Sequence, residues 1–354
     1  MALGGDEGLR YVGAFLITFG AAWALTPLAG RYAHRHGFLD RPGGHSTHST
    51  DTPTLGGLAI AAAFILVGIW AGGADGQLVT VLAGAVMLAV VGALDDRRSL
   101  SPWLRLGLEA AAAVALWAVG VRAGLLGHTW FDLPLTVFWV MAVVNAFNMI
   151  DNHDGIAALV AAMSTLGIAA ISADSGYHLV AAFSLAVAGA CLGFFVHNKP
   201  PATIFLGDAG SMFLGFLVAA LALKVDLPQG SWIVRLAVAA LLVAVPLFDE
   251  ALVVLARVRD HRPVMLGSTD HSAHRLRALG WSKNRVVVTM GGAQAVCSLV
   301  AFGVAEAATD VLAISALFVL IAAASTLLAT ALKMPTPRRE AGAVGAVGGF
   351  AHSK

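Results

Sequence analysis

Long apolar stretches separated by short polar segments dominate this chain of 354 residues. We expect eleven of them to form helices, over residues 9–29, 55–73, 77–94, 102–121, 132–150, 155–173, 178–196, 209–225, 232–256, 285–308 and 311–332. A helix needs roughly 20 apolar residues to cross a hydrocarbon core of roughly 30 Å. The stretches lack the polar alternation of a membrane β-barrel. The pattern therefore predicts an all-α, polytopic integral membrane protein with about eleven transmembrane helices.

The composition agrees with a membrane protein and excludes an ordinary soluble enzyme. Hydrophobic residues make up 58% of the chain, charged residues 12%, and the mean hydropathy is +0.80. A net charge of +1 gives no reason to expect a nucleic acid partner. Cys191 and Cys297 fall inside apolar stretches, so we interpret them as packing residues and not as a disulfide or metal pair.

Most of the 22 Lys and Arg residues lie at helix ends that share one side of the membrane. By the positive-inside rule that side is cytoplasmic, which places the N-terminus outside and the C-terminus inside. The first apolar stretch has no clear cleavage site, so we do not expect it to be removed as a signal. We expect a single transmembrane domain over residues 1–335 and a disordered cytoplasmic tail over residues 336–354.

The polar residues cluster at the cytoplasmic ends of the expected helices. The first cluster contains Asp95 and Asp96, followed by Arg97 and Arg98. Adjacent carboxylates at the edge of a hydrocarbon core are costly to ionise, which favours a bound cation or a role in proton transfer. A solvated helix end would have the same residues, and the motif alone does not decide between the two interpretations.

The second cluster, residues 145–155, indicates chemistry more strongly. Asn145 and Asn148 are three residues apart and share one helix face, and Asp151 and Asp154 continue that spacing. Four oxygen-bearing side chains suit a hard cation such as Mg²⁺, with Mn²⁺ as the alternative. Helix capping and turn formation would explain one or two of these residues but not all four.

Three further segments lie on the same side. Phe205 to Ser211 begins a helix at Asp208, which would cap the helix or help its amides bind a phosphate. A basic loop contains His271 and His274 with two arginines, which suits contact with a phosphate or a sugar, although arginines also bind anionic lipid. His45 and His48 occupy a loop rich in Gly, Pro and hydroxyl residues, where solvation is the simpler interpretation. If the ends of residues 77–94, 132–150 and 209–225 converge, these segments form one pocket for a diphosphate carried with Mg²⁺.

These motifs resemble those of the polyprenyl-phosphate N-acetylhexosamine-1-phosphate transferases, and specifically the bacterial undecaprenyl-phosphate GlcNAc-1-phosphate transferases of glycosyltransferase family 4. Leu94 to Arg97 resembles the family's Asp-Asp motif, residues 145–155 its Asn-x-x-Asn-x-x-Asp-x-x-Asp-Gly motif, and residues 205–211 its Phe-x-Gly-Asp-x-Gly-Ser motif. The resemblance implies that a polyprenyl phosphate attacks the β-phosphorus of a UDP-N-acetylhexosamine and releases UMP. That reaction is the first membrane step of cell-envelope glycan synthesis, at the cytoplasmic face of the plasma membrane.

The resemblance also implies roles for individual residues. Asp208 and Asn148 would bind Mg²⁺, Asp95 and Asp96 would act in catalysis, Phe205 and Asp154 would bind the uracil, His271 and His274 would lie near the sugar phosphate, and Asn145 and Asp151 would complete the substrate site. Two departures affect the choice of sugar. Ala273 replaces the first of two adjacent histidines, and Asn152-His153 replaces a Gly followed by an apolar residue.

Two alternatives remain open. Within the family, the chain could be the phospho-N-acetylmuramoyl-pentapeptide transferase of peptidoglycan synthesis. From another class, an ion-coupled transporter would need acidic groups near the middle of the membrane, where only Asp249 and Glu250 are candidates. The expected partners are a UDP-sugar, a polyprenyl phosphate and the membrane, with a homodimer left open.

Overall fold

The computed structural model describes residues 5–40, 51–72, 76–124, 129–263 and 270–334. The helices in the described residues are α1 (Gly5–His36), α2 (Gly56–Gly72), α3 (Gly76–Arg98), α4 (Pro102–Ala118), α5 (Thr129–Ile150), α6 (Ile156–Asp174), α7 (His178–Asn198), α8 (Gly207–Leu223), α9 (Trp232–Leu242), α10 (Ala244–Arg259), α11 (Ser272–Ala278), α12 (Lys283–Ala307) and α13 (Asp310–Ala331). A short antiparallel pair joins β1 (Leu39–Asp40) to β2 (Thr52–Pro53). The tail expected over 336–354 and the residues His45 and His48 lie outside the described residues.

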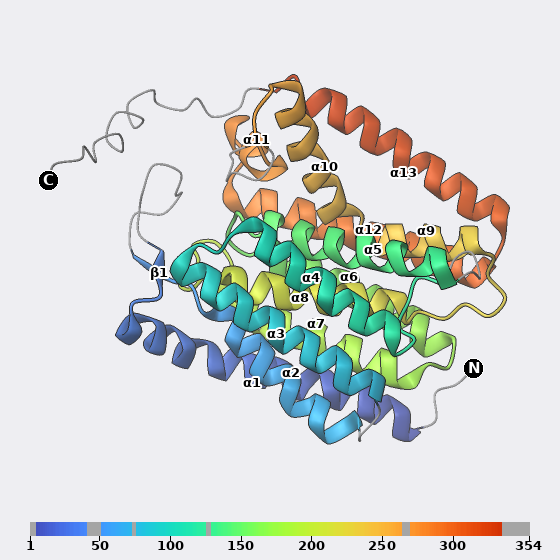
Figure 1. Cartoon of the computed structure of the whole chain (residues 1–354), viewed down its shortest axis with the longest axis horizontal. Coiled ribbons are helices and arrows are strands. Elements are labelled where there is room, and N and C mark those ends of the chain that lie inside the picture. The colour runs from blue at the N-terminus through green and yellow to red at the C-terminus, as the bar shows by residue number, and fades with distance from the viewer. Residues whose placement is uncertain (1–4, 41–50, 73–75, 125–128, 264–269, 335–354) are drawn as a thin grey trace, which may run out of the picture.

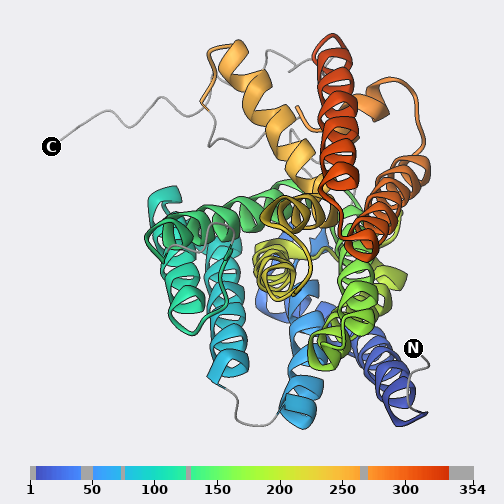
Figure 2. The ribbon, with the colours of Figure 1, turned by 90° about the vertical axis from the view of Figure 1, so that its right-hand side faces the viewer.

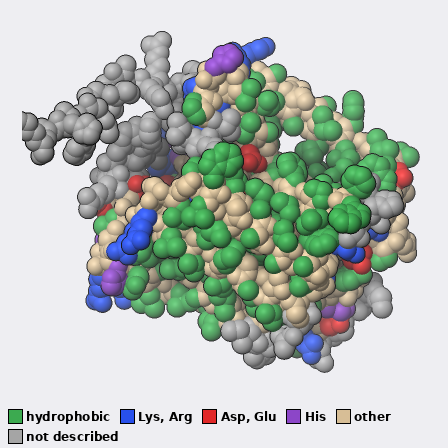
Figure 3. Space-filling model, in the orientation of Figure 1, with side chains coloured by type: hydrophobic (Ala, Val, Ile, Leu, Met, Phe, Trp, Pro, Cys, Tyr) green, Lys and Arg blue, Asp and Glu red, His purple; other side chains and the backbone are tan. Residues whose placement is uncertain are grey.

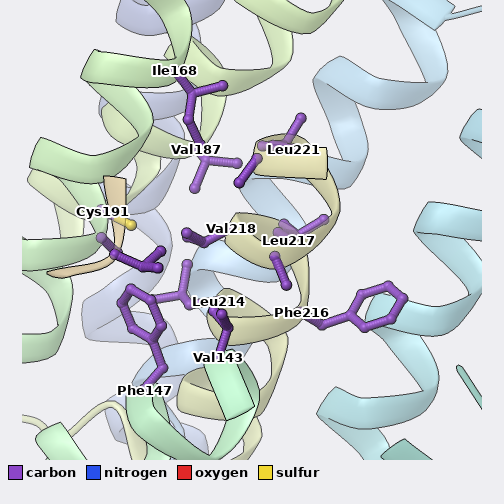
Figure 4. Packing of buried hydrophobic residues seen from close by; sticks show 14 of the residues in the cluster. Val143, Phe147, Ile168, Val187, Cys191, Leu214, Phe216, Leu217, Val218 and Leu221 are labelled. Carbon is purple, nitrogen blue, oxygen red and sulfur yellow. The ribbon is translucent and has the colours of Figure 1, made fainter. Parts of the chain in front are cut away.

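Helix α8 lies at the centre of the bundle. Every residue from Ala209 to Ala222 is buried, as expected of a helix that is apolar on all its faces. Helices α2, α3, α5 and α6 pack around it, while α1 packs along α7 at one side of the bundle (Figures 1 and 2). Figure 4 shows Leu214, Leu217 and Val218 of α8 among apolar side chains of α5 and α7. The core therefore surrounds the helix that has Asp208 in its first turn.

Glycines allow α8 to approach its neighbours closely. A Cβ atom added to Gly57 of α2 would lie 2.1 Å from the Cα atom of Gly210 in α8. A Cβ atom added to Gly92 of α3 would lie 2.2 Å from the backbone oxygen of Asp208. Side chains at these positions would separate the helices, so the sequence places glycine where backbones touch. The N-terminal end of α8 is fixed against α2 and α3 as a result.

The described residues form an all-helical, multi-pass membrane protein. Seven helices are long and apolar enough to cross a membrane, or up to eight if the bent pair of α9 and α10 counts as one span. The expected stretches over 55–73, 102–121 and 209–225 are shorter helices in the structure, because α2, α4 and α8 have 17 residues each. Of these seven helices, α13 is the most exposed, with 6% of its most apolar segment buried. Hydrophobic side chains cover much of the face seen in Figure 3.

The stretch expected to be one helix over 232–256 is broken. Helices α9 and α10 meet at an angle of 76° around Val243. Pro246 has no N–H for the carbonyl of Leu242, which an unbroken helix would require. Gln294 of α12 instead donates to the oxygens of Leu241 and Leu242, at 3.1 and 3.0 Å. Its own oxygen accepts from the backbone N–H of Val245 at 3.1 Å, so one buried amide replaces the interrupted helical bonds.

Candidate active site

The chain enters α8 through a tight connection that exposes Asp208 at the helix start. Gly56 and Gly57 donate their backbone N–H groups to the oxygens of Phe205 and Leu206, both at 2.9 Å. Gly207 has φ +74°, and a Cβ atom there would lie 2.1 Å from the backbone oxygen of Thr54. Only glycine takes this conformation in this space without strain. The backbone conformation of Gly207 therefore sets the direction in which α8 begins and the position of Asp208 in its first turn.

Asp96 of α3 caps the N-terminus of α8. Its two carboxylate oxygens accept from the backbone N–H groups of Asp208 and Ala209, at 3.0 and 3.4 Å. These amides have no partner within the helix, and a carboxylate at this position interacts favourably with the helix dipole. Asp96 thus links the α3 end to the α8 start.

Asp95 belongs to a second network that includes Arg105, a residue the sequence analysis did not assign to the site. The Arg105 Nη1 atom lies 2.6 Å from Asp95 Oδ2 and 3.9 Å from Asp208 Oδ2. Its Nη2 atom donates to Asn148 Oδ1 at 2.9 Å. Asn148 in turn donates to Asp208 Oδ1 at 2.7 Å and to Ser211 Oγ at 3.0 Å. Three oxygen-bearing side chains from α3, α5 and α8 therefore surround one guanidinium group.

The expected convergence of the α3, α5 and α8 ends is confirmed. Arg105 could have been found as an arginine within an expected apolar span, a position that is costly without a partner. Asn145 shares a helix with Asn148 but joins a different group. It donates to Glu109 Oε2 at 2.6 Å, and the other carboxylate oxygen of this fully buried side chain has no partner among the described residues.

The α5–α6 connection carries Asp151 and Asp154. The pKa of Asp151 is raised well above its usual range, first by burial and then by the carboxylate of Asp208. Asp154 is 6% exposed, and its Oδ2 atom lies 3.1 Å from Lys283 Nζ and accepts from the backbone N–H of Ala202 at 3.3 Å. Lys283 begins α12, far from Asp154 in sequence, so no local pattern indicated the pair.

His153 lies between these two carboxylates in sequence. It is 4% exposed, and neither ring nitrogen has a hydrogen-bond partner among the described residues. Burial lowers its pKa to about 4, so the imidazole is neutral near pH 7. Its ring centroid lies 6.3 Å from that of His274 in α11. His153 therefore faces the loop that contains the two histidines expected near the sugar phosphate.

His271 pairs with Asp249 of α10. The distance from His271 Nδ1 to Asp249 Oδ2 is 2.8 Å, and the backbone N–H of Ser272 donates to Asp249 Oδ1 at 2.7 Å. Asp249 is 1% exposed. Its position in the sequence gave no sign of these two polar partners. The ring centroids of His271 and His274 are 6.1 Å apart.

The arginine after His274 has a structural environment. Arg275 is 3% exposed, and its guanidinium donates to the backbone oxygens of Asp270 and Ala331 at 2.8 and 2.6 Å. Arg257 and Arg262 also lie within 4 Å of the Asp270 carboxylate. These contacts fix the start of α11 to α10 and α13. Arg275 thus binds backbone oxygens within the protein. The sequence had instead indicated contact with phosphate or lipid.

The side chains around Arg105 include oxygen donors of the kind that a hard metal ion requires. Among residues 5–40, 51–72, 76–124, 129–263 and 270–334, no three His, Cys, Asp or Glu side chains are grouped to hold a metal ion. Asp208, Asn148 and Asp95 are a mixed set of carboxylate and amide oxygens, which are the donors that Mg²⁺ prefers. These oxygens already surround the cationic group of Arg105. The chemistry of the set fits a hard divalent cation that keeps water and substrate oxygens as further ligands.

Comparisons with known proteins agree with these motifs. Residues 78–226 match the model of Glycosyl transferase family 4. A probable undecaprenyl-phosphate N-acetylglucosaminyl 1-phosphate transferase of Bacillus subtilis is 29% identical over 89% of this chain and 90% of its own. A decaprenyl-phosphate N-acetylglucosaminephosphotransferase of Mycobacterium tuberculosis is 32% identical over 83% and 80%. A phospho-N-acetylmuramoyl-pentapeptide-transferase of a Synechococcus species is 36% identical over 57% and 61%.

Proposed function

Because this chain belongs to glycosyl transferase family 4, we propose that it transfers GlcNAc-1-phosphate from UDP-GlcNAc to a polyprenyl phosphate and releases UMP. The observation that carries the proposal is the meeting of Asp95, Asn148 and Asp208 around one cationic group at three helix ends. The similarity covers more of the chain for the N-acetylglucosamine enzymes than for the muramoyl-pentapeptide enzyme. UDP-GlcNAc is therefore the preferred donor in this proposal.

The proposed cofactor is Mg²⁺, with Asp208 and Asn148 as the protein side chains that would hold it. When bound to the diphosphate, the ion neutralises charge that would otherwise repel an anionic nucleophile. The remaining work falls to the protein. Arg105 contributes a second positive charge beside Asp208. Its contacts with Asp95 and Asn148 hold that charge at the N-terminal end of α8. Both charges favour binding of a diphosphate at this point.

The transfer itself forms one P–O bond and breaks another. An oxygen of the polyprenyl phosphate bonds to the β-phosphorus of the UDP-sugar, and the bond from that phosphorus to the oxygen bridging to UMP breaks. We propose that Asp95 or Asp96 accepts the proton of a monoprotonated lipid phosphate, whose second pKa is about 6. Since much of this nucleophile is already ionised near pH 7, its alignment contributes more than base strength. A double displacement through an aspartate is the alternative route.

The remaining substrate contacts are proposed from the family motifs. Phe205 would stack on the uracil, Asp154 would accept hydrogen bonds from it, and Asn145 and Asp151 would complete the pocket. His271 and His274 would contact the sugar phosphate. The ion pair between Lys283 and Asp154 supports this arrangement, because it holds the start of α12 against the α5–α6 connection. Asn152 and His153 border the same site and are candidates for selecting the sugar.

We further propose that the site faces the cytoplasm from a multi-pass protein of the plasma membrane. The distribution of Lys and Arg supports this orientation, with the N-terminus outside and the C-terminus inside. Eleven membrane crossings remain the expected number, with α2, α4, α8 and the bent α9–α10 pair embedded among the seven longer helices. UDP-sugars are available on the cytoplasmic side, which agrees with the orientation.

The experiment that tests the proposal measures UMP release by purified protein in lipid nanodiscs. Undecaprenyl phosphate is supplied with Mg²⁺ and one UDP-sugar at a time, including UDP-GlcNAc and UDP-N-acetylmuramoyl-pentapeptide. The proposal expects the fastest release with UDP-GlcNAc. Preference for the muramoyl donor would assign the peptidoglycan reaction. No release from any donor, together with gradient-driven uptake into vesicles, would replace the enzyme with a transporter.

A further inference from the structure

The hydrogen bond between Asp249 and His271 fixes the protonation of the imidazole. A carboxylate only accepts hydrogen bonds, so a 2.8 Å contact to Nδ1 requires the proton on Nδ1. The other ring nitrogen, Nε2, is then left as an acceptor or, in the charged ring, as a donor. Asp249 and His271 are 1% and 5% exposed, so little water competes for the pair. The geometry therefore selects one tautomer and one ring orientation.

A structural role as a helix cap explains only half of this arrangement. Asp249 Oδ1 accepts from the backbone N–H of Ser272 at the start of α11, which a cap requires. The second oxygen, Oδ2, contacts the imidazole and adds nothing to the cap. One carboxylate thus ties both the backbone and the side chain of the His271 segment to α10.

The break between α9 and α10 places Asp249 where it can make both bonds. Asp249 follows the break by six residues, and the amide of Gln294 satisfies the backbone groups on both sides of it. Gln294 of α12 thus holds the start of α10, and Asp249 further along α10 holds the start of α11. Such outer partners commonly orient a histidine and set which nitrogen carries the proton.

His271 lies at one end of a row of three histidines. Its ring lies 6.1 Å from His274, which lies 6.3 Å from His153. His153 has two buried ring nitrogens with no hydrogen-bond partner among the described residues, so a polar group at that end of the row lacks the partner that buried polar groups usually have. The row leads to the connection that contains Asp151, whose charge interacts with that of Asp208.

We infer that Asp249 is a positioning residue: it holds His271 in the Nδ1-protonated form so that Nε2 faces the phosphate of the transferred sugar phosphate. The inference rests on the proposed function, because that function places His271 beside this phosphate. An anionic phosphate oxygen accepts a hydrogen bond from Nε2 when the ring carries both protons, and the contact of Nδ1 with the Asp249 carboxylate is the same in that form. Asp249 itself contacts no substrate.

Asp249→Asn is the sharpest perturbation. The asparagine oxygen still accepts from the Ser272 N–H, while its amide nitrogen faces Nδ1 and can only donate. His271 must then move its proton to Nε2 to keep the bond. We expect the cap to survive and kcat for UMP release to fall about 10- to 100-fold, the range seen when a partner that orients a metal-bound histidine is lost.

A double-mutant cycle separates positioning from a general structural effect. If Asp249 acts through His271, Asp249→Asn changes kcat less than about twofold in a His271→Ala background. Equal losses in both backgrounds, or wild-type activity in the single variant, would overturn the inference. Asp260→Asn at the end of the same helix is the matched control, since Asp260 is exposed and pairs with Arg262. It is expected to retain wild-type turnover.

Histidine ¹⁵N spectra test the inference without activity. The chain has 12 His residues, and His271→Gln identifies the signal of His271. We expect Nδ1 protonation in the wild type and Nε2 protonation in Asp249→Asn. A wild-type ring protonated on Nε2 alone overturns the inference whatever the activity. Failure of the wild type to release UMP with any UDP-sugar would instead reject the proposed function, and the spectra would still decide the tautomer.

Discussion

Replacing Gln294 with methionine removes the amide that completes the break between α9 and α10 while conserving most of the side-chain volume. Three backbone groups then lose a bond to the amide: the oxygens of Leu241 and Leu242 and the N–H of Val245. The Leu241 oxygen still accepts from the backbone N–H of Val243, so the Leu242 oxygen and the Val245 N–H are the two groups left unpaired. Gln294 is fully buried, so water does not replace these bonds. An unpaired buried group costs about 1–3 kcal/mol. Side-chain hydrogen bonds within membranes average about 0.6 kcal/mol, because the unfolded chain also finds partners there.

These two values bound the expected loss. Three bonds at the membrane average give about 2 kcal/mol, and two fully unpaired groups give up to about 6 kcal/mol. Because Leu241 and Leu242 share one amide nitrogen, we expect a loss of about 2–5 kcal/mol in the free energy of unfolding. Equilibrium unfolding in mixed detergent and SDS micelles measures it. Gln229→Met, in an exposed loop, is the control and is expected within about 0.5 kcal/mol of wild type.

A loss below about 0.5 kcal/mol in Gln294→Met would refute this account of the break. It would mean that the backbone groups find other partners or that α9 and α10 join into one helix. The spectra of His271 provide a second measurement in the same variant. A destabilised joint moves α10, so the signal that reports the Asp249 contact is expected to shift, whereas Gln229→Met leaves it unchanged.

Asp208→Ala is expected to abolish Mg²⁺-dependent UMP release, because it removes a proposed metal ligand at the start of α8. The control variant Asp226→Ala, beyond the other end of that helix, should retain UMP release. Near-normal turnover in Asp208→Ala would reject the metal assignment. Asp96→Asn should remove turnover but leave nucleotide binding measurable by calorimetry, and full activity would exclude Asp96 from the mechanism. Burial lowers the pKa of His153 from 6.5 to about 4, so the unfolded chain binds an extra proton between these pH values. The contribution of His153 to the free energy of unfolding is therefore fully present above pH 6.5 and is lost as the pH drops towards 4. In His153→Leu, the free energy of unfolding should fall about 3 kcal/mol less over this pH range than in the wild type. If the two proteins lose stability equally over this range, burial does not lower the pKa of His153.

The sequence predicted the parts of the site that depend on local spacing. Asn148, Asp151 and Asp154 lie three residues apart after an apolar stretch, and Asp208 follows a glycine at a helix start, so their polarity at the membrane edge was visible without a structure. Family resemblance supplied their proposed roles. The convergence of helix ends followed because all the clusters lie at ends assigned to one side of the membrane.

The parts that depend on tertiary approach were not visible. Asp249 and His271 are 22 residues apart and meet only because α10 leaves α9 at 76°. Hydropathy is uniform across that break, and Pro246 was the single local signal of it. Lys283 and Asp154 are separated by 129 residues. Arg105 was counted only as a topological charge, because its partners come from three other helices.

The enclosure of α8 has a consequence for movement during turnover. Asp208 begins a helix whose backbone touches Gly57 of α2 on one side and Gly92 of α3 on another, so the helix cannot shift without displacing the core. Conformational change must therefore occur elsewhere: in the Arg105 side chain, in α10 and α11, and in the connections that border the pocket. We therefore expect the end of the site with the proposed metal ligands to stay in place while the elements around it adjust to the substrates.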